Sequence, residues 1–590
     1  MTRVCAAHLV TPADASVTIQ TAMADELGFT CDSDGDDVVE NYWRQGAELT
    51  LGNTLGEAPE YYALNYATTA GTINGSTLTV GNADATVSAA IRSDGQPHSI
   101  TYMKADGTTD QADAIALDSY ETVKEYGNYV VHLAAGTYYV GHDISYDYKI
   151  VADGDITLIL GNGKTMTLAS NVTGIQGGTI DLTIYGQSLD PATAGTLRYD
   201  GTSNLGIYVG DYTQHSGNVS LICSDYNGVK ALEASTVTLN GGKLTITANS
   251  TNAKAIRASM TVTVTGGQLD ATATGTNAVG ILASYGDITL GWTNASDYIH
   301  VTSYSANGTV KIADGQSLYN GSEVLSGTIT DMSKLDGKTL RPYKTITLAD
   351  AADNSSTIRE WNGSVAEVTL QGRTLTKDGN WNTLCLPFAV NSFAGTPLEG
   401  ATVKELDATL SSLAGNTLTL KFKDATSIEA GKPYIIKWTT TGDNIVNPVF
   451  SNVTISSTTP TAVESYDHTV TFVGQYSPFS IVESGATGDN EGNKNEILLM
   501  TTGNKIGYSK NPRTLKCFRC HFYVPTSSGE FTARNIEVDF GEGEATSVAS
   551  MEDGRSKMED VYYTLDGRKL EGKPTAKGMY IVNGRKVIIK

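Results

Sequence analysis

A repeat near the middle of the chain constrains its fold more than any other feature. The segment GVKALEASTVTLNGGKLTITANST, which begins at Gly228, is followed by AKAIRASMTVTVTGGQLDATATGT from Ala253 and by AVGILASYGDITL from Ala278. The Ala-Ser pairs of the three segments begin 24 and 25 residues apart, at Ala234, Ala258 and Ala283. A period in this range is typical of solenoid proteins.

Each repeat contains short segments in which apolar and polar residues alternate, such as Val237–Leu239 and Leu244–Ile246. Alternation places the aliphatic side chains on one face of a strand, and β-branched residues favour strands. No single repeat could bury its apolar face, whereas repeats stacked at about 4.8 Å would cover one another. The repeat therefore predicts an all-β chain built on a parallel, right-handed β-helix. A long β-sandwich with coincidental spacing is the alternative.

Composition narrows the class of protein. A chain of 590 residues is too long for one core and predicts several domains. The net charge of −23, with only 18% charged residues, disfavours binding to nucleic acids and to anionic membranes. Thr, Ser, Gly and Asn are frequent, and 30 tyrosines stand against 11 phenylalanines, a composition typical of an exposed, all-β extracellular protein.

The sequence contains no apolar run of about 18 residues, so we expect no transmembrane helix. The first residues, MTRVCAAHLV, are too weakly apolar for a signal peptide. Either the chain is cytoplasmic, or the true start lies upstream of Met1.

The distribution of strand and turn patterns predicts seven segments along the chain. They are an unassigned N-terminal segment (1–42), a small β-grasp-like module (43–92), a region that caps the first coil (99–155), the β-helix with its C-terminal cap (156–345), a β-sandwich (346–545), a Ser-rich linker (546–558) and a small terminal β-module (559–590).

The terminal module resembles the C-terminal sorting domain of proteins exported by the Bacteroidota type IX secretion system. The matching residues are Asp566, Gly567, Arg568, Lys577, Gly578, Tyr580, Asn583 and Gly584, and the Asn-Gly pair predicts a two-residue hairpin. The resemblance implies passage across the outer membrane, removal of the module and attachment to surface lipopolysaccharide. The secretion machinery is then a partner, and the location is extracellular or on the outer-membrane surface.

Two other segments resemble modules of secreted proteins. Residues 43–92, with the strand patterns 46–51 and 84–89, resemble one Listeria–Bacteroides repeat. Residues 364–545, with the motifs 370–375, 378–388, 429–434 and 518–522, resemble a module of large secreted Bacteroidales proteins. Both imply a surface location, and they imply a signal peptide upstream of Met1. Neither implies a reaction.

The segment Cys517-Phe518-Arg519-Cys520-His521 matches the C-x-x-C-H pattern of haem attachment. Residues 515–524 are predicted as one strand, so the two thiols would point to opposite faces and could share neither a haem nor a disulfide. Buried free thiols are expected, and a disulfide from Cys385 to Cys517 or Cys520 is the alternative.

An acidic run near the N-terminus, with Asp32, Asp34 and Asp36, resembles the opening of a calcium loop. An EF-hand would next require Gly and Glu where this chain has Asp37 and Trp43. A solvated turn is the favoured interpretation, and Ca²⁺ the weak alternative; no other cofactor is expected.

Parallel β-helices often carry polysaccharide lyases and hydrolases, so an enzyme is one hypothesis. Such chemistry needs convergent carboxylates, or bound calcium with a basic residue. We find no paired acids at a repeat-equivalent position, and no G-x-S-x-G, H-E-x-x-H or P-loop motif. Glu233 and Arg257, which are repeat-equivalent, predict a surface ion pair.

The favoured hypothesis is a non-catalytic binding protein, an adhesin or glycan-contacting protein displayed by the β-helix, with an extracellular glycan or a host surface as its partner. Aromatic rings stack on the apolar faces of sugars, and the candidate contacts are Tyr208, Tyr212, Tyr226, Tyr285 and Trp292. The alternatives are a polysaccharide-active lyase or hydrolase and a structural surface component.

Overall fold

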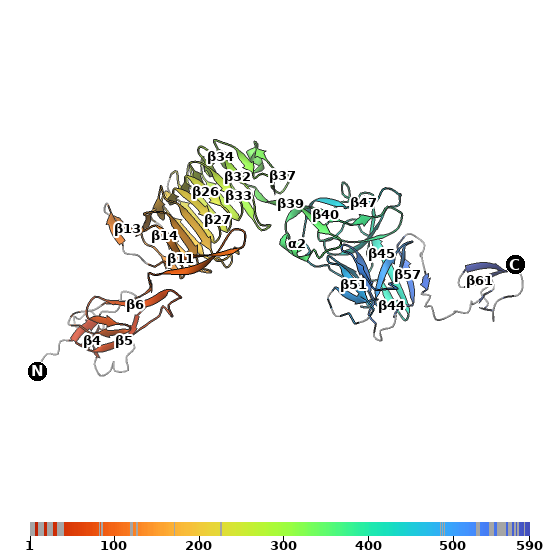
Figure 1. The fold of residues 1–590 in the computed structure, drawn as a ribbon, viewed down its shortest axis with the longest axis horizontal. Helices are drawn as coiled ribbons and strands as arrows, with labels where there is room; N and C mark the ends of the chain where they lie inside the picture. The colour runs from red at the N-terminus through yellow and green to blue at the C-terminus, as the bar shows by residue number, and fades with distance from the viewer. Residues whose placement is uncertain are drawn as a thin grey trace. The chain divides into compact units, whose positions relative to one another are not determined.

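The fold was obtained as a computed structural model (Figure 1). It describes residues 40–541 except 82, 84–85, 119–121, 126–127, 170, 225–226, 484, 487, 489 and 527–531, together with the short segments 6–9, 17–19, 28–31, 548–550, 562–563, 569–570, 574, 578–582 and 585–589. The chain divides into two compact units, residues 1–344 with 364–366 and residues 345–363 with 367–590. The all-β prediction is confirmed, since the described residues form strands with only two short helical segments.

Unit 1 is dominated by a stacked region, residues 128–312, in which the chain passes repeatedly through three parallel sheets (Figure 1). Sheet 1 contains β14 (Gly136–Val140), β17 (Ile156–Leu160), β20 (Leu182–Gly186), β23 (Asp211–Gln214), β26 (Thr236–Leu239), β29 (Val262–Val264), β32 (Ile288–Leu290) and β35 (Val310–Ile312). Sheet 2 contains β13 (Asn128–Leu133), β16 (Lys149–Ala152), β19 (Ile175–Gly177), β22 (Leu205–Val209), β25 (Lys230–Ala234), β28 (Lys254–Ala258), β31 (Val279–Ala283) and β34 (Tyr304–Ala306). Sheet 3 contains β15 (Ile144–Ser145), β18 (Thr165–Leu168), β21 (Thr196–Gly201), β24 (Asn218–Ser224), β27 (Lys243–Asn249), β30 (Gln268–Thr274) and β33 (Tyr298–Val301).

One period of the sequence repeat is one circuit through the three sheets. Parallel pairing places Val237 opposite Val262 and Leu244 opposite Leu269. Residues such as Leu244 and Ile246 are fully buried and belong to one continuous core, because alternate side chains of every strand point inward. Each circuit thus covers the apolar face that a single repeat would expose.

The stacked region is longer than the sequence pattern predicted. Parallel pairing already joins β13 to β16 and β14 to β17, before Ile156, where we expected the first coil. It also continues through β33, β34 and β35, beyond the last repeat visible in the sequence, which starts at Ala278. Beyond β35, the antiparallel strands β36 (Ser317–Tyr319) and β39 (Thr339–Ala349) follow. The circuits in both extensions differ in length, so the sequence shows no constant period there and the extensions were not predicted.

A long hairpin joins the stacked region to the strands before it. Strands β10 (Pro97–Met103) and β11 (Thr109–Ala116) pair antiparallel, and the end of β11 pairs parallel with β14. Before the hairpin, β5 (Glu48–Asn53) pairs with β8 (Thr77–Thr79), and β6 (Tyr62–Thr68) pairs with β9 (Val87–Ser93). Leu49, Leu51 and Leu78 form a small separate core.

Unit 2 contains mainly antiparallel sheets. One sheet includes β42 (Asn382–Cys385), β46 (Pro433–Lys437), β43 (Thr402–Leu406), β45 (Thr417–Asp424) and β57 (Asn535–Asp539). Another includes β50 (Thr471–Gly474), β56 (Cys520–Tyr523), β53 (Ile497–Thr501) and β54 (Lys505–Tyr508). The rings of Phe422 from the first sheet and of Phe472 and Phe522 from the second meet between them.

The prediction of one strand over residues 515–524 is wrong. Strand β55 (Arg513–Leu515) ends before Cys517, Phe518 has a φ of 58°, and β56 begins at Cys520. Tertiary contacts override the strand propensity of this segment: Lys516 and Arg519 both bond to the buried carboxylate of Asp350, at 3.1 and 3.2 Å. The described cysteines, at 223, 385, 517 and 520, are buried free thiols.

Near the C-terminus, β61 (Gly578–Val582) pairs antiparallel with β62 (Arg585–Ile589), with Val582 opposite Arg585. This pairing agrees with the predicted hairpin and includes two of the sorting-motif residues, Gly578 and Tyr580. The other six, at 566, 567, 568, 577, 583 and 584, lie outside the described residues, as do Asp32, Asp34 and Asp36.

Candidate functional site

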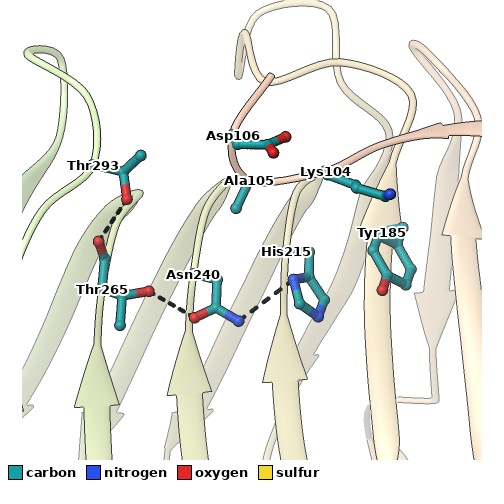
Figure 2. Close-up of a pocket in the computed structure, with 8 residues that line it drawn as sticks. All are labelled: Lys104, Ala105, Asp106, Tyr185, His215, Asn240, Thr265 and Thr293. Carbon is teal, nitrogen blue, oxygen red and sulfur yellow. Dashed lines mark hydrogen bonds between the residues drawn. The ribbon is translucent and has the colours of Figure 1, made fainter. Parts of the chain in front are cut away.

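A groove of about 310 Å³ lies between the tip of the β10–β11 hairpin and one corner of the stacked region (Figure 2). Its lining residues are Lys104, Ala105 and Asp106 from the hairpin and Tyr185, His215, Asn240, Thr265 and Thr293 from five successive circuits. The groove is the candidate functional site, because it gathers several kinds of polar group at one concave surface.

Four of these residues form a continuous row, which we call the polar row: Tyr185, His215, Asn240 and Thr265. Tyr185 lies within β20, and the other three directly follow β23, β26 and β29. The pairing of these four strands places the residues at equivalent positions. Their spacing is therefore that of neighbouring strands, about 4.8 Å. The fold, rather than any local motif, brings them together.

Hydrogen bonds orient the polar row (Figure 2). The Thr265 hydroxyl donates to Oδ1 of Asn240 at 2.6 Å, and Nδ2 of Asn240 donates to Nδ1 of His215 at 3.4 Å. Because Nδ1 accepts, the proton of the neutral imidazole is on Nε2. Burial lowers the pKa of His215, which favours this neutral form. Its second nitrogen is consequently a donor and is not available as a general base.

The ring of Tyr185 contacts two other rings. It stacks on His215 with centroids 4.7 Å apart and an interplanar angle of 5°, and its centroid is 4.3 Å from that of Tyr102. These contacts fix its position and reduce the ring surface that a sugar could cover.

The hairpin tip is held over the polar row by contacts far apart in sequence. Met103 pairs with Gly186, and the Ser216 hydroxyl donates to the Met103 carbonyl at 2.6 Å. At the rim, Nζ of Lys104 is 2.8 Å from a carboxylate oxygen of Asp110, which raises the pKa of Lys104. The rim thus presents an ammonium group and, at Asp106, a carboxylate.

The outer face of sheet 1, beside the polar row, carries threonines in register. Pairing along the sheet aligns half-buried threonines of consecutive strands, at Thr137, Thr157, Thr183, Thr213, Thr238, Thr263 and Thr289. We call them the threonine row. They give the face one hydroxyl per circuit.

The expectation that no paired acids occupy repeat-equivalent positions is wrong, because Asp181 and Asp211 are equivalent in the pairing of β20 with β23. Asp155, Asp181 and Asp211 immediately precede, or begin, paired strands of sheet 1. Oδ1 of Asp155 accepts the backbone N–H of Asp181, and Oδ1 of Asp181 accepts that of Asp211. These three acids therefore have a structural role, since the hydrogen bonds of their carboxylates link neighbouring circuits. No group of three potential metal ligands occurs among the described residues.

The predicted aromatic contact residues differ in burial and in position. Tyr212 was wrongly chosen, because its side chain is fully buried and its hydroxyl donates to Gln214 at 2.8 Å. Tyr208 is half-buried on the outside of sheet 2, and Trp292 is half-buried with Nε1 donating to the Ser317 carbonyl. Tyr285 is 75% exposed. None of these four lines the groove. Tyr226 lies outside the described residues.

A second hollow, of about 550 Å³, lies across sheet 3 near the start of the stacked region. Its lining includes Tyr146, Asp147, Arg198 and Asp200, and the Arg198 guanidinium is 3.5 Å from the Asp200 carboxylate. Two carboxylates therefore accompany a basic residue in this hollow.

Comparisons with protein-family models, with curated proteins and with solved structures found no match. Among the described residues, no helix is both long and apolar enough to cross a membrane.

Proposed function

We propose that this protein is a secreted or surface-anchored, non-catalytic binding protein that contacts a glycan at the groove. In this proposal the stacked region is a right-handed parallel β-helix, and unit 2 is a β-sandwich. The observation that carries the proposal is the polar row under the hairpin tip, in which hydrogen bonds link His215, Asn240 and Thr265 from circuit to circuit.

A glycan suits the groove because its hydroxyls both donate and accept hydrogen bonds. The groove offers a hydroxyl, an amide, an imidazole N–H, an ammonium and a carboxylate within one surface. The adjacent threonine row would extend the contact along the stacked circuits, so that a linear ligand could span several of them.

A binding role is favoured over catalysis at this site for two reasons. Asp106 is the one carboxylate among the lining residues, whereas glycoside hydrolysis uses two. His215 presents a donor nitrogen instead of a base. The enzyme alternative is supported by the second hollow, where Asp147 and Asp200 lie with Arg198.

The test is a glycan-array screen of the full chain, with a parallel assay for reducing or unsaturated ends released from each hit. Asn240→Leu removes the amide at the centre of the polar row, and Thr245→Val, on sheet 3, is the control. Binding that Asn240→Leu weakens at least tenfold and Thr245→Val leaves unchanged would support the proposal. Product release that Asp200→Asn abolishes would support a lyase or hydrolase. Neither binding nor product would favour a structural surface component.

We also propose export through the C-terminal module. A chain that lacks residues 560–590 should fail to reach the surface of the producing cell, whereas the full chain should reach it. Equal surface labelling of both chains would contradict the sorting role and would leave the glycan proposal untouched.

A further inference from the structure

Sheet 2 carries a patch of positive charge on a strongly acidic chain. Parallel pairing of β25 with β28 places Lys230 beside Lys254 and Glu233 beside Arg257. We call these four residues the basic strip. Three cations and one carboxylate give the strip a net charge of +2, whereas the whole chain carries −23.

The single carboxylate of the strip is already fully engaged. The Glu233 side chain is only 10% exposed, accepts from Nζ of Lys230 at 3.0 Å and forms an ion pair with Arg257. The sequence had predicted a pair on the surface, but the carboxylate is buried between two cations. It therefore neutralises only one of the three positive charges.

Lys254 has no carboxylate partner among the ion pairs of the described residues. Its ammonium donates to the backbone carbonyls of Asn252, at 2.7 Å, and of Asn277, at 3.4 Å. Burial and the positive charge of Lys230 lower the pKa of Lys254. An anion that bound here would relieve the repulsion between these two neighbouring cations.

An aromatic ring borders the basic strip. Pairing of β22 with β25 places Tyr208 beside Glu233, and the Tyr208 ring packs closely over Gly178, where an added Cβ would lie 2.7 Å from it. A ring next to cations suits a charged sugar, since the ring can cover apolar C–H groups while the cations bind the acid group.

We propose that the basic strip binds a linear acidic polysaccharide whose carboxylate or sulfate groups contact Lys230, Lys254 and Arg257. The Arg257 fork and the lysine ammoniums recognise both groups, and the strip runs across successive circuits at about 4.8 Å. A nucleic acid is disfavoured, because its binding draws on many contacts between basic side chains and phosphates, whereas the strip offers three cations on a chain of net charge −23. This site lies on another sheet than the groove and does not depend on the glycan proposal.

The test measures binding of the full chain to polygalacturonate, heparin, neutral dextran and duplex DNA at low ionic strength. We expect binding to at least one of the two acidic polysaccharides, none to dextran, and weakening as salt is added. Polygalacturonate preference would assign carboxylate as the ligand group, and heparin preference sulfate. Lys254→Gln should weaken binding about tenfold, the loss expected for one charged contact.

Two variants make the outcome specific. Lys243→Gln, which removes a similar charge from sheet 3, should leave the affinity within about twofold. Glu233→Gln should tighten binding, because it removes the negative charge from the strip; a merely structural role would not predict this sign. Equal losses in Lys254→Gln and Lys243→Gln, stronger binding to DNA than to both polysaccharides, or no binding to either polysaccharide would overturn the proposal.

Discussion

The ion triad around Glu233 makes a quantitative prediction about stability. Glu233→Gln keeps the size of the side chain but removes the charge that holds Lys230 and Arg257 together across β25 and β28. Lys230 and Lys254 then lie at the spacing of neighbouring strands, and the strip holds no carboxylate to neutralise them or Arg257. Unit 1 should be less stable, because the variant loses the attraction of Glu233 to Lys230 and to Arg257 and leaves the repulsion among the cations unopposed.

The magnitude follows from the exposure of the three side chains. Removing one partner of a fully buried ion pair costs about 3–5 kcal/mol. Here Glu233 is 10% exposed, but Lys230 is 37% and Arg257 29% exposed, so both cations can turn toward water. Solvent screening therefore reduces the expected loss to about 1–2 kcal/mol in the free energy of unfolding. In urea this is a midpoint lower by roughly 0.5 M.

The assay is urea unfolding of the full chain, with Glu323→Gln as the matched control. Glu323 pairs with Lys334 at 2.8 Å, but both side chains are well exposed, so its loss should cost less than about 0.5 kcal/mol. Added salt should shrink the deficit of Glu233→Gln by screening the remaining cations. Equal deficits in the two variants, or a deficit that salt does not change, would refute the reasoning.

Three more tests concern packing, titration and turns. Gly474→Ala places a Cβ 2.3 Å from Sγ of Cys385 and should lower the free energy of unfolding by about 1–3 kcal/mol, whereas Gly507→Ala, with nothing within 4 Å, should lower it little. Equal melting temperatures of the two variants would contradict this packing. Burial lowers the pKa of His521 to about 4, so the contribution of the neutral ring to stability is complete above pH 6.5 and is lost as pH falls through 4. Between pH 6.5 and 4 the urea midpoint of the wild type should therefore fall more than that of His521→Gln, and parallel falls in the two proteins would contradict this role of His521. Asn252 has a φ of 59°, so Asn252→Ala should lose about 1–2 kcal/mol and Asn252→Gly less, which the same urea titration checks by the order of the two midpoints.

The sequence predicted the fold where circuit length is constant. Between Val237 and Leu269 the strands recur at 25 residues, so apolar positions of one repeat align with those of the next. Further toward the N-terminus, Leu182 pairs with Tyr212, 30 residues later. A longer turn at one corner changes the period without changing the register of the sheet, and periodicity alone could not detect those circuits.

The same irregularity explains the wrong choice of Tyr212. Taken alone, a tyrosine that alternates with threonine is as compatible with the outside of a strand as with the inside. Its neighbours in the sheet, Leu182 and Val237, show which face of the strand it occupies, because both are buried. Register therefore carries information that residue type does not.

The groove was beyond sequence reasoning for a related physical reason. His215, Asn240 and Thr265 are different residue types, they follow their strands singly, and no motif links them. The roof comes from Lys104 and Asp106, which precede the stacked region in the chain. The sequence does contain one signal for the groove, which is a polar residue directly after the last, inward-pointing residue of each strand of sheet 1. Once the register of Gln214, Leu239 and Val264 is known, the next residue of each strand must project outward at the same corner, so a row of polar residues there follows from the fold.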